Sequence, residues 1–143
     1  MIFPDVNILV YAHRADMRQH KAILGWLEGA LLSGRPVAVS DMVLSAFLRI
    51  VTNPKIFGRP SPLEDALRFA EQLRSQPGAV LVAPGAGHWR LFRDLCLATE
   101  VKGGMVPDAY IAALAIEHGA ELVTNDRDFA RFKGLKWSQP PKD

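Results

Sequence analysis

Short apolar runs alternate with helical stretches along this chain, and this alternation restricts the fold more than any other feature. Ile23, Leu24, Leu27 and Leu31 recur at helical spacing within residues 17–32. The predicted strands cover residues 2–3, 36–39, 79–82, 121–124 and 135–138. The predicted helices cover residues 17–32, 41–52, 62–74, 87–99, 107–118 and 129–132. Apolar strands separated by helices indicate βαβ units, and therefore an α/β fold with a parallel sheet covered on both faces.

Length and composition fit a single domain over residues 1–143. Hydrophobic residues make up 49% and charged residues 22%, which allows one sizeable core and excludes bulk disorder. The single cysteine, Cys96, rules out an internal disulfide and a cysteine-rich zinc site. No stretch approaches the roughly 20 apolar residues of a membrane span. The N-terminus shows no signal peptide, so we expect a cytoplasmic protein.

Acidic residues follow the predicted strands, where ligands bind in open parallel sheets. Asp5 follows the first strand, Asp126 and Asp128 follow the strand that ends at Thr124, and Asp108 lies in the first turn of a helix. Each of these residues alone could be a helix cap. Together, converging carboxylates repel one another unless a hard cation such as Mg²⁺ or Mn²⁺ neutralises them. Such an ion can activate water for phosphodiester hydrolysis.

Four motifs carry a resemblance to a known family. They are FPDVNILVYA at 3–12, RIVTNP at 49–54, VPDAYIAALAIEHG at 106–119 and LVTNDRDF at 122–129. In this order they resemble a PIN domain, and more narrowly a VapC-type toxin of a bacterial toxin–antitoxin pair. The resemblance spans nearly the whole chain.

The resemblance implies a metal-dependent endoribonuclease with a three-layer α/β/α fold and a short five-stranded parallel sheet. It also implies Mg²⁺ or Mn²⁺ in an acidic pocket, an RNA substrate, a homodimer and a cognate VapB-type antitoxin. By position, Asp5, Asp108 and Asp126 match the family's catalytic acids, and Asp128 matches an accessory metal ligand. Asn7 and Thr124 match polar residues that orient groups around the metal.

One position departs from the family pattern. Ala46 stands where the family usually has a glutamate. Asp41 is the nearest acid, but five helical positions rotate it by about 500°, which leaves it roughly 140° away from Ala46. Asp41 could reach the site from the start of its helix, or Ser40 or Asp41 could simply cap that helix. The departure predicts a weaker metal site and leaves the number of ions open.

Two surfaces have functional and structural interpretations. Arg49, Lys55 and Arg59 could contact the RNA backbone, or they could form an ordinary solvated basic surface. Apolar positions on helices 17–32 and 41–52 could form a groove for a helix of the antitoxin, or they could pack into the core.

Three functions therefore compete. The first is the endoribonuclease toxin. The second is a module that binds RNA or antitoxin with weakened catalysis, because Ala46 replaces the glutamate. The third is a phosphatase of the haloacid dehalogenase type, but that family needs a second aspartate where this chain has Asn7.

Overall fold

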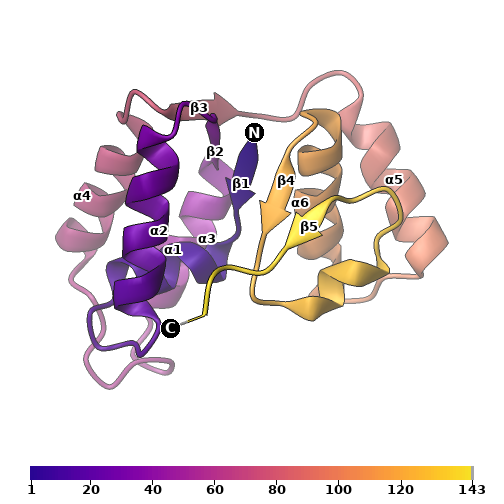
Figure 1. Cartoon of the computed structure of the whole chain (residues 1–143). Coiled ribbons are helices and arrows are strands. Elements are labelled where there is room, and N and C mark those ends of the chain that lie inside the picture. Colours follow the sequence, from indigo (N-terminus) through magenta and orange to yellow (C-terminus); the bar gives the residue numbers. More distant parts are fainter. Residues whose placement is uncertain (143) are drawn as a thin grey trace.

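The computed structural model describes residues 1–142 and contains a five-stranded parallel sheet with helices on both faces (Figure 1). The strands are β1 (Ile2–Pro4), β2 (Val37–Ser40), β3 (Ala79–Val82), β4 (Glu121–Val123) and β5 (Trp137–Ser138). The helices are α1 (Val6–His13), α2 (His20–Leu32), α3 (Asp41–Val51), α4 (Leu63–Arg74), α5 (His88–Thr99) and α6 (Met105–Glu117). A short 3₁₀ helix, η1 (Arg127–Arg131), follows β4. The predicted α/β fold with a five-stranded parallel sheet is confirmed.

The sheet places the first strand at its centre. Its order is β3-β2-β1-β4-β5, so β1 lies between β2 and β4. Ile2 pairs with Val37 on one side and with Glu121 on the other. Because all the pairs are parallel, the segments that follow β1, β2 and β4 meet at the same edge of the sheet.

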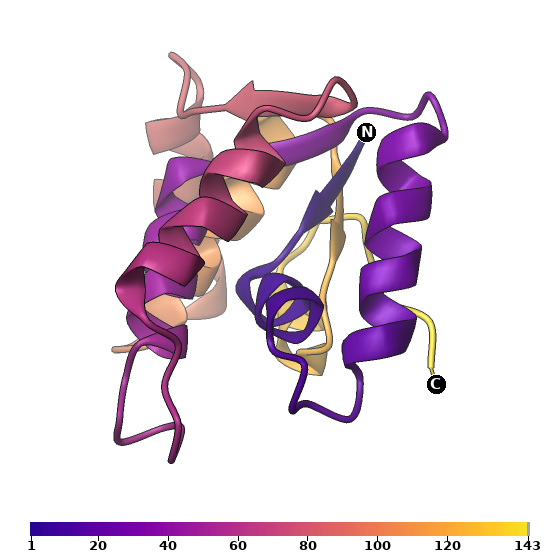
Figure 2. The ribbon, with the colours of Figure 1, turned by 90° about the vertical axis from the view of Figure 1, so that its left-hand side faces the viewer.

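The helices form two layers around this sheet. Figure 2 shows α2 on one side of the central strands and α3, α4 and α6 on the opposite side. Within residues 1–142, no helix is long and apolar enough to cross a membrane.

The core explains why these strands lack an alternating polar pattern. All residues of β1 and β2 are buried, as expected for central strands covered on both faces. Helix α6 is also buried along most of its length, and Ala109, Ala112, Ala113 and Ala115 have no exposed surface. Their small side chains let α6 approach its neighbours closely.

The sequence patterns missed one helix and misplaced several ends. Helix α1 was not predicted, because its residues VNILVYAH are largely apolar and buried and give little amphipathic signal. The helix expected from residue 17 begins at His20, since residues 14–20 form successive turns. Helix α6 begins at Met105, two residues before Pro107. The last strand is confined to Trp137–Ser138.

Candidate active site

Three carboxylates from separate elements line one cavity at the carboxyl end of the sheet. Asp5 follows β1 and caps α1, and its Oδ1 accepts a 2.7 Å hydrogen bond from the backbone N–H of Val6. Asp108 lies in the first turn of α6, and Asp126 is the N-cap of η1. The cavity they line has a volume of about 490 Å³. The fold thus brings Asp5 together with two acids that lie more than a hundred residues further along the sequence.

A hydroxyl group holds this carboxylate cluster in place. Thr124 is fully buried, and its Oγ1 donates a 2.7 Å hydrogen bond to Asp5 Oδ2. The same oxygen accepts hydrogen bonds from Asn7 Nδ2 at 3.1 Å and from the backbone N–H of Asp126 at 3.0 Å. Asn7 Nδ2 also lies 3.2 Å from Asp5 Oδ2. Asn7 and Thr124 therefore fix the direction of the Asp5 carboxylate.

Burial and mutual repulsion make the cluster hard to ionise completely. Burial raises the pKa of Asp5, against the lowering effect of its hydrogen bonds from Thr124 and Val6. Desolvation, together with the negative charges of Asp5 and Asp126, raises the pKa of Asp108 to about 6. The nearby Arg131 opposes this shift only in part. A carboxyl group that titrates this close to neutrality marks a candidate functional site.

The donor chemistry of the cavity suits a hard divalent cation. The acidic side chains offer only oxygen atoms, which Mg²⁺ and Mn²⁺ prefer, and a cation would relieve the repulsion at Asp108. In the part of the chain that the structure describes, no three His, Cys, Asp or Glu side chains are grouped closely enough to hold an ion as they stand. Mg²⁺ usually keeps several waters and binds through one or two carboxylates, so water molecules would complete its coordination here.

Asp128 lies outside the lining of this cavity. Its side chain is 71% exposed and forms an ion pair with Arg131 at 3.2 Å. Its backbone N–H donates a 2.9 Å hydrogen bond to Asp126 Oδ1. Asp128 thus holds the Asp126 carboxylate through its main chain and adds negative charge near Asp108.

The position that lacks the glutamate faces the cavity. Ala46 of α3 is part of the cavity lining. Asp41 is not, because its carboxylate pairs with Arg74 of α4, at 3.0 and 3.3 Å. The structure therefore gives Asp41 no role in replacing the missing carboxylate. Ser40 occupies the N-cap position of α3, but its side chain makes no capping hydrogen bond.

The three basic residues predicted to contact RNA occupy two different places. Arg49 of α3 lines the cavity. Lys55 and Arg59 are exposed on the loop of residues 52–62 and do not line the cavity.

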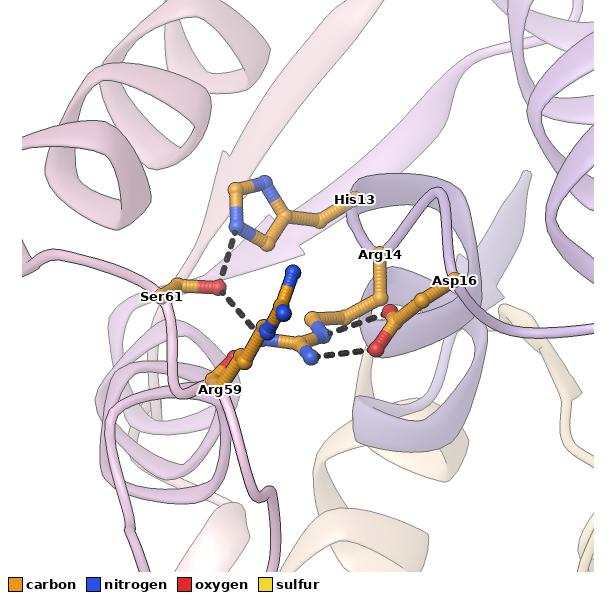
Figure 3. Close-up of polar contacts among 5 residues, drawn as sticks. All are labelled: His13, Arg14, Asp16, Arg59 and Ser61. Carbon is orange, nitrogen blue, oxygen red and sulfur yellow. Dashed lines mark hydrogen bonds and ion pairs between the residues drawn. The ribbon is translucent and has the colours of Figure 1, made fainter.

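A buried arginine anchors this loop to the end of α1 (Figure 3). Arg14 is 7% exposed, and its Nη1 donates hydrogen bonds to the carbonyl oxygen of Arg59 at 2.8 Å and to Ser61 Oγ at 3.1 Å. Its guanidinium pairs with Asp16 and lies 4.0 Å from the ring centroid of Phe57. The loop is thereby fixed relative to α1, which carries Asn7 and one wall of the cavity.

Sequence reasoning missed several residues of the cavity wall. Tyr11, Met17, Met42 and Ile50 line it along with the acids. The spacing of Met42, Ala46 and Ile50 places them on one helix face. This face of α3 lines the same cavity as the acids because of how α3 packs, and the sequence does not reveal that packing.

Two further grooves lie on the surface, and α4 lines both. Helices α2 and α4 form one groove of about 330 Å³, with Leu24, Leu27, Leu31 and Leu32 on the α2 side. Helices α3 and α4 form the other. Helices α2 and α3, predicted to share one groove, therefore each line a different groove with α4. No sequence pattern indicated α4 as the common wall, because its apolar face is typical of ordinary core packing.

Comparison with known proteins adds to this geometry. The PIN domain family profile matches residues 2–135. The chain is 41% identical to a VapC ribonuclease of Mycobacterium bovis, over 98% of this chain and 95% of that protein. It is 40% identical to the ribonuclease VapC25 of Mycobacterium tuberculosis, over 99% of each. Its fold resembles a chain of VapBC2 from Rickettsia felis, solved bound to a promoter DNA fragment. That match has a TM-score of 0.75 and 23% identity, and covers 99% of this chain and 100% of that one.

Proposed function

The chain belongs to the PIN domain family and, within it, to the VapC ribonucleases, and from this membership we propose that it is a metal-dependent endoribonuclease toxin. It hydrolyses phosphodiester bonds of cytoplasmic RNA and is held inactive by a VapB-type antitoxin. The observation that carries the proposal is the convergence of Asp5, Asp108 and Asp126 on one cavity.

Each polar residue of the cavity has a distinct task in this proposal. Asp5, Asp108 and Asp126 would hold Mg²⁺ or Mn²⁺, which when bound supplies the Lewis acidity that activates water and offsets charge on the phosphate. Thr124 and Asn7 keep the Asp5 carboxylate oriented. Arg49 places a positive charge on the cavity wall, where it can bind an RNA phosphate.

Incubation of the protein with total RNA tests the proposal directly. We expect discrete fragments with Mg²⁺ or Mn²⁺ and none with EDTA. The Asp5→Asn and Asp108→Asn variants should lose at least about a hundredfold in rate, since each removes a charged ligand of the ion. Sequencing of the fragment ends would identify the target.

The matched control is Asp94→Asn, which makes the same change at an exposed residue of α5 paired only with its neighbour Arg93. This variant should cleave like the parent. Full activity of both Asp5→Asn and Asp108→Asn, in proteins whose circular dichroism is unchanged, would refute the mechanism.

A second function is favoured by Ala46. This residue lines the cavity without a carboxylate, and Asp41 is held elsewhere by Arg74. If the domain binds RNA but leaves it intact with either ion, it is a binding module. The Ala46→Glu variant then distinguishes a lost ligand from a different activity, because it should restore cleavage in the first case only.

We also propose that the groove between α2 and α4 binds the antitoxin. It is apolar and open, and Leu32 on its rim is 88% exposed. An amphipathic helix is the kind of segment that such a groove accommodates. Leu32→Arg should therefore weaken co-purification with the product of a short reading frame directly upstream. Leu63→Arg, at an exposed leucine of α4 that does not line the groove, should not.

The homodimer expected from the resemblance is part of the same proposal. Large apolar side chains such as Trp89 and Leu97 are exposed on α5, at 68% and 71%. Light scattering on the purified protein should give the mass of two chains. The mass of one chain at micromolar concentration would contradict it.

A further inference from the structure

The cavity that holds the carboxylates is also lined by apolar side chains. Among them are Val10 of α1, Met17 of the turn before α2, and Met42 and Ile50 of α3. We refer to these four residues as the apolar wall. None of them is a ligand for Mg²⁺ or for a phosphate, so the proposed hydrolysis gives them no role.

Ala46 leaves space between two residues of the apolar wall. Met42, Ala46 and Ile50 are spaced four residues apart and share one face of α3. The methyl group of Ala46 lies between the two larger side chains and leaves space where a longer side chain would stand. At about 490 Å³, the cavity lies within the range of roughly 300 to 1,000 Å³ typical of small-molecule sites.

The occupant must be flat, apolar on its faces and joined to a phosphate. Methionine side chains are flexible and polarisable, and they make favourable contacts with aromatic rings. Arg49 lines the same cavity and can bind a phosphate, while the acids define the reacting end. An unpaired nucleotide of RNA meets all these conditions, because its base is exposed and can stack on a protein side chain.

Tyr11 gives the cavity an ordered rim. Its hydroxyl oxygen accepts a 3.3 Å hydrogen bond from Asn125 Nδ2, and the backbone N–H of Asn125 donates to Asn7 Oδ1 at 3.1 Å. The ring is therefore tied to the same network that orients Asp5. The same ring lines the cavity together with the acids and the apolar wall.

We infer that the apolar wall is a subsite for one unpaired nucleobase adjacent to the phosphate that is cleaved. The inference rests on the proposed function and deepens it, since it explains how the enzyme would select a single-stranded target. It also gives Ala46 a positive role, because the space that replaces a carboxylate admits the base.

Binding of short RNAs tests the subsite. The probes are fluorescein-labelled pentaribonucleotides of each single base, and an abasic ribose-phosphate chain of the same length, with Mg²⁺ present. The Asp5→Asn background prevents hydrolysis during the measurement. In that background the double variant Met42→Ala/Ile50→Ala should weaken binding of at least one pentaribonucleotide about tenfold, a typical loss for one stacked base. Binding of the abasic chain should change less than twofold.

Two further variants serve as controls for misfolding and for the general loss of an apolar side chain. Ala46→Leu fills the space without adding charge, and it should reduce base-dependent binding like the double variant. Leu63→Ala, which removes an exposed apolar side chain at the start of α4, should leave the binding of every probe unaffected. Equal weakening of the pentaribonucleotides and the abasic chain, or no weakening of either, would overturn the subsite.

The result also separates the subsite from the proposed function. A parent protein that cleaves total RNA but binds the abasic chain as tightly as RNA retains the function and lacks the subsite. A parent that neither cleaves nor binds RNA refutes both.

Discussion

At the residue scale, the Thr124 hydroxyl is the group on which the site depends most. Its Oγ1 donates a hydrogen bond to Asp5 and accepts hydrogen bonds from the Asn7 side chain and from the backbone N–H of Asp126. Thr124→Val keeps the shape of the side chain and removes all three hydrogen bonds of the hydroxyl. We expect the free energy of unfolding to fall by about 1–3 kcal/mol, because buried polar groups lose their partner. Urea denaturation measures the loss. Thr99→Val, at a partly exposed residue of α5, should change stability by less than about 0.5 kcal/mol.

The pKa of Asp108 makes a second prediction at this scale. Its pKa is about 6 in the folded protein and 3.8 in the unfolded reference. Between these values the folded state binds more protons than the unfolded state, so stability falls as pH rises. In EDTA, the parent should therefore lose stability relative to Asp108→Asn as pH increases from 4 to 6.5. Thermal unfolding of both proteins across this pH range measures the direction of this change. A parent that gains stability relative to Asp108→Asn as pH rises would contradict the prediction.

At the element scale, Arg14 couples α1 to the loop of residues 52–62 (Figure 3). Arg14→Met keeps most of the aliphatic stem and removes the guanidinium that holds the loop. The loop should then open more often, and trypsin should cut faster after Lys55, which is exposed there. Mass spectrometry of the first fragments locates the cut. Arg93→Met, at an exposed arginine of α5, should leave the cutting rate unchanged.

At the scale of the whole molecule, ion binding should stabilise the entire fold. The three acids belong to elements from both halves of the chain, so an ion that binds them links these elements only in the folded state. Mg²⁺ or Mn²⁺ should raise the melting temperature at pH 7.5 and do so less at pH 5, where Asp108 is protonated. The Asp5→Asn variant should show no rise. An equal rise at both pH values would point to ions bound elsewhere.

The sequence predicted the acids at the strand ends better than the other residues that line the cavity. Asp5 and Asp126 could be found because Asp5 directly follows one apolar strand and Asp126 lies three residues after the end of another. Their convergence depends on β4 pairing with β1, which no local pattern encodes. Met17 belongs to an irregular turn and Met42 to a helix face whose orientation is set by packing, so neither could be assigned to the site. The run of residues 6–13 was missed because its helix is largely buried and apolar.

The central position of β1 also governs when this site comes into existence. Translation makes β1 long before its neighbour β4 and the segment bearing Thr124 and Asp126. A nascent chain that ends before residue 124 carries Asp5 without the hydroxyl that orients it. The cavity can therefore form only after this late segment has been synthesised, and we expect a chain that terminates before it to lack the site.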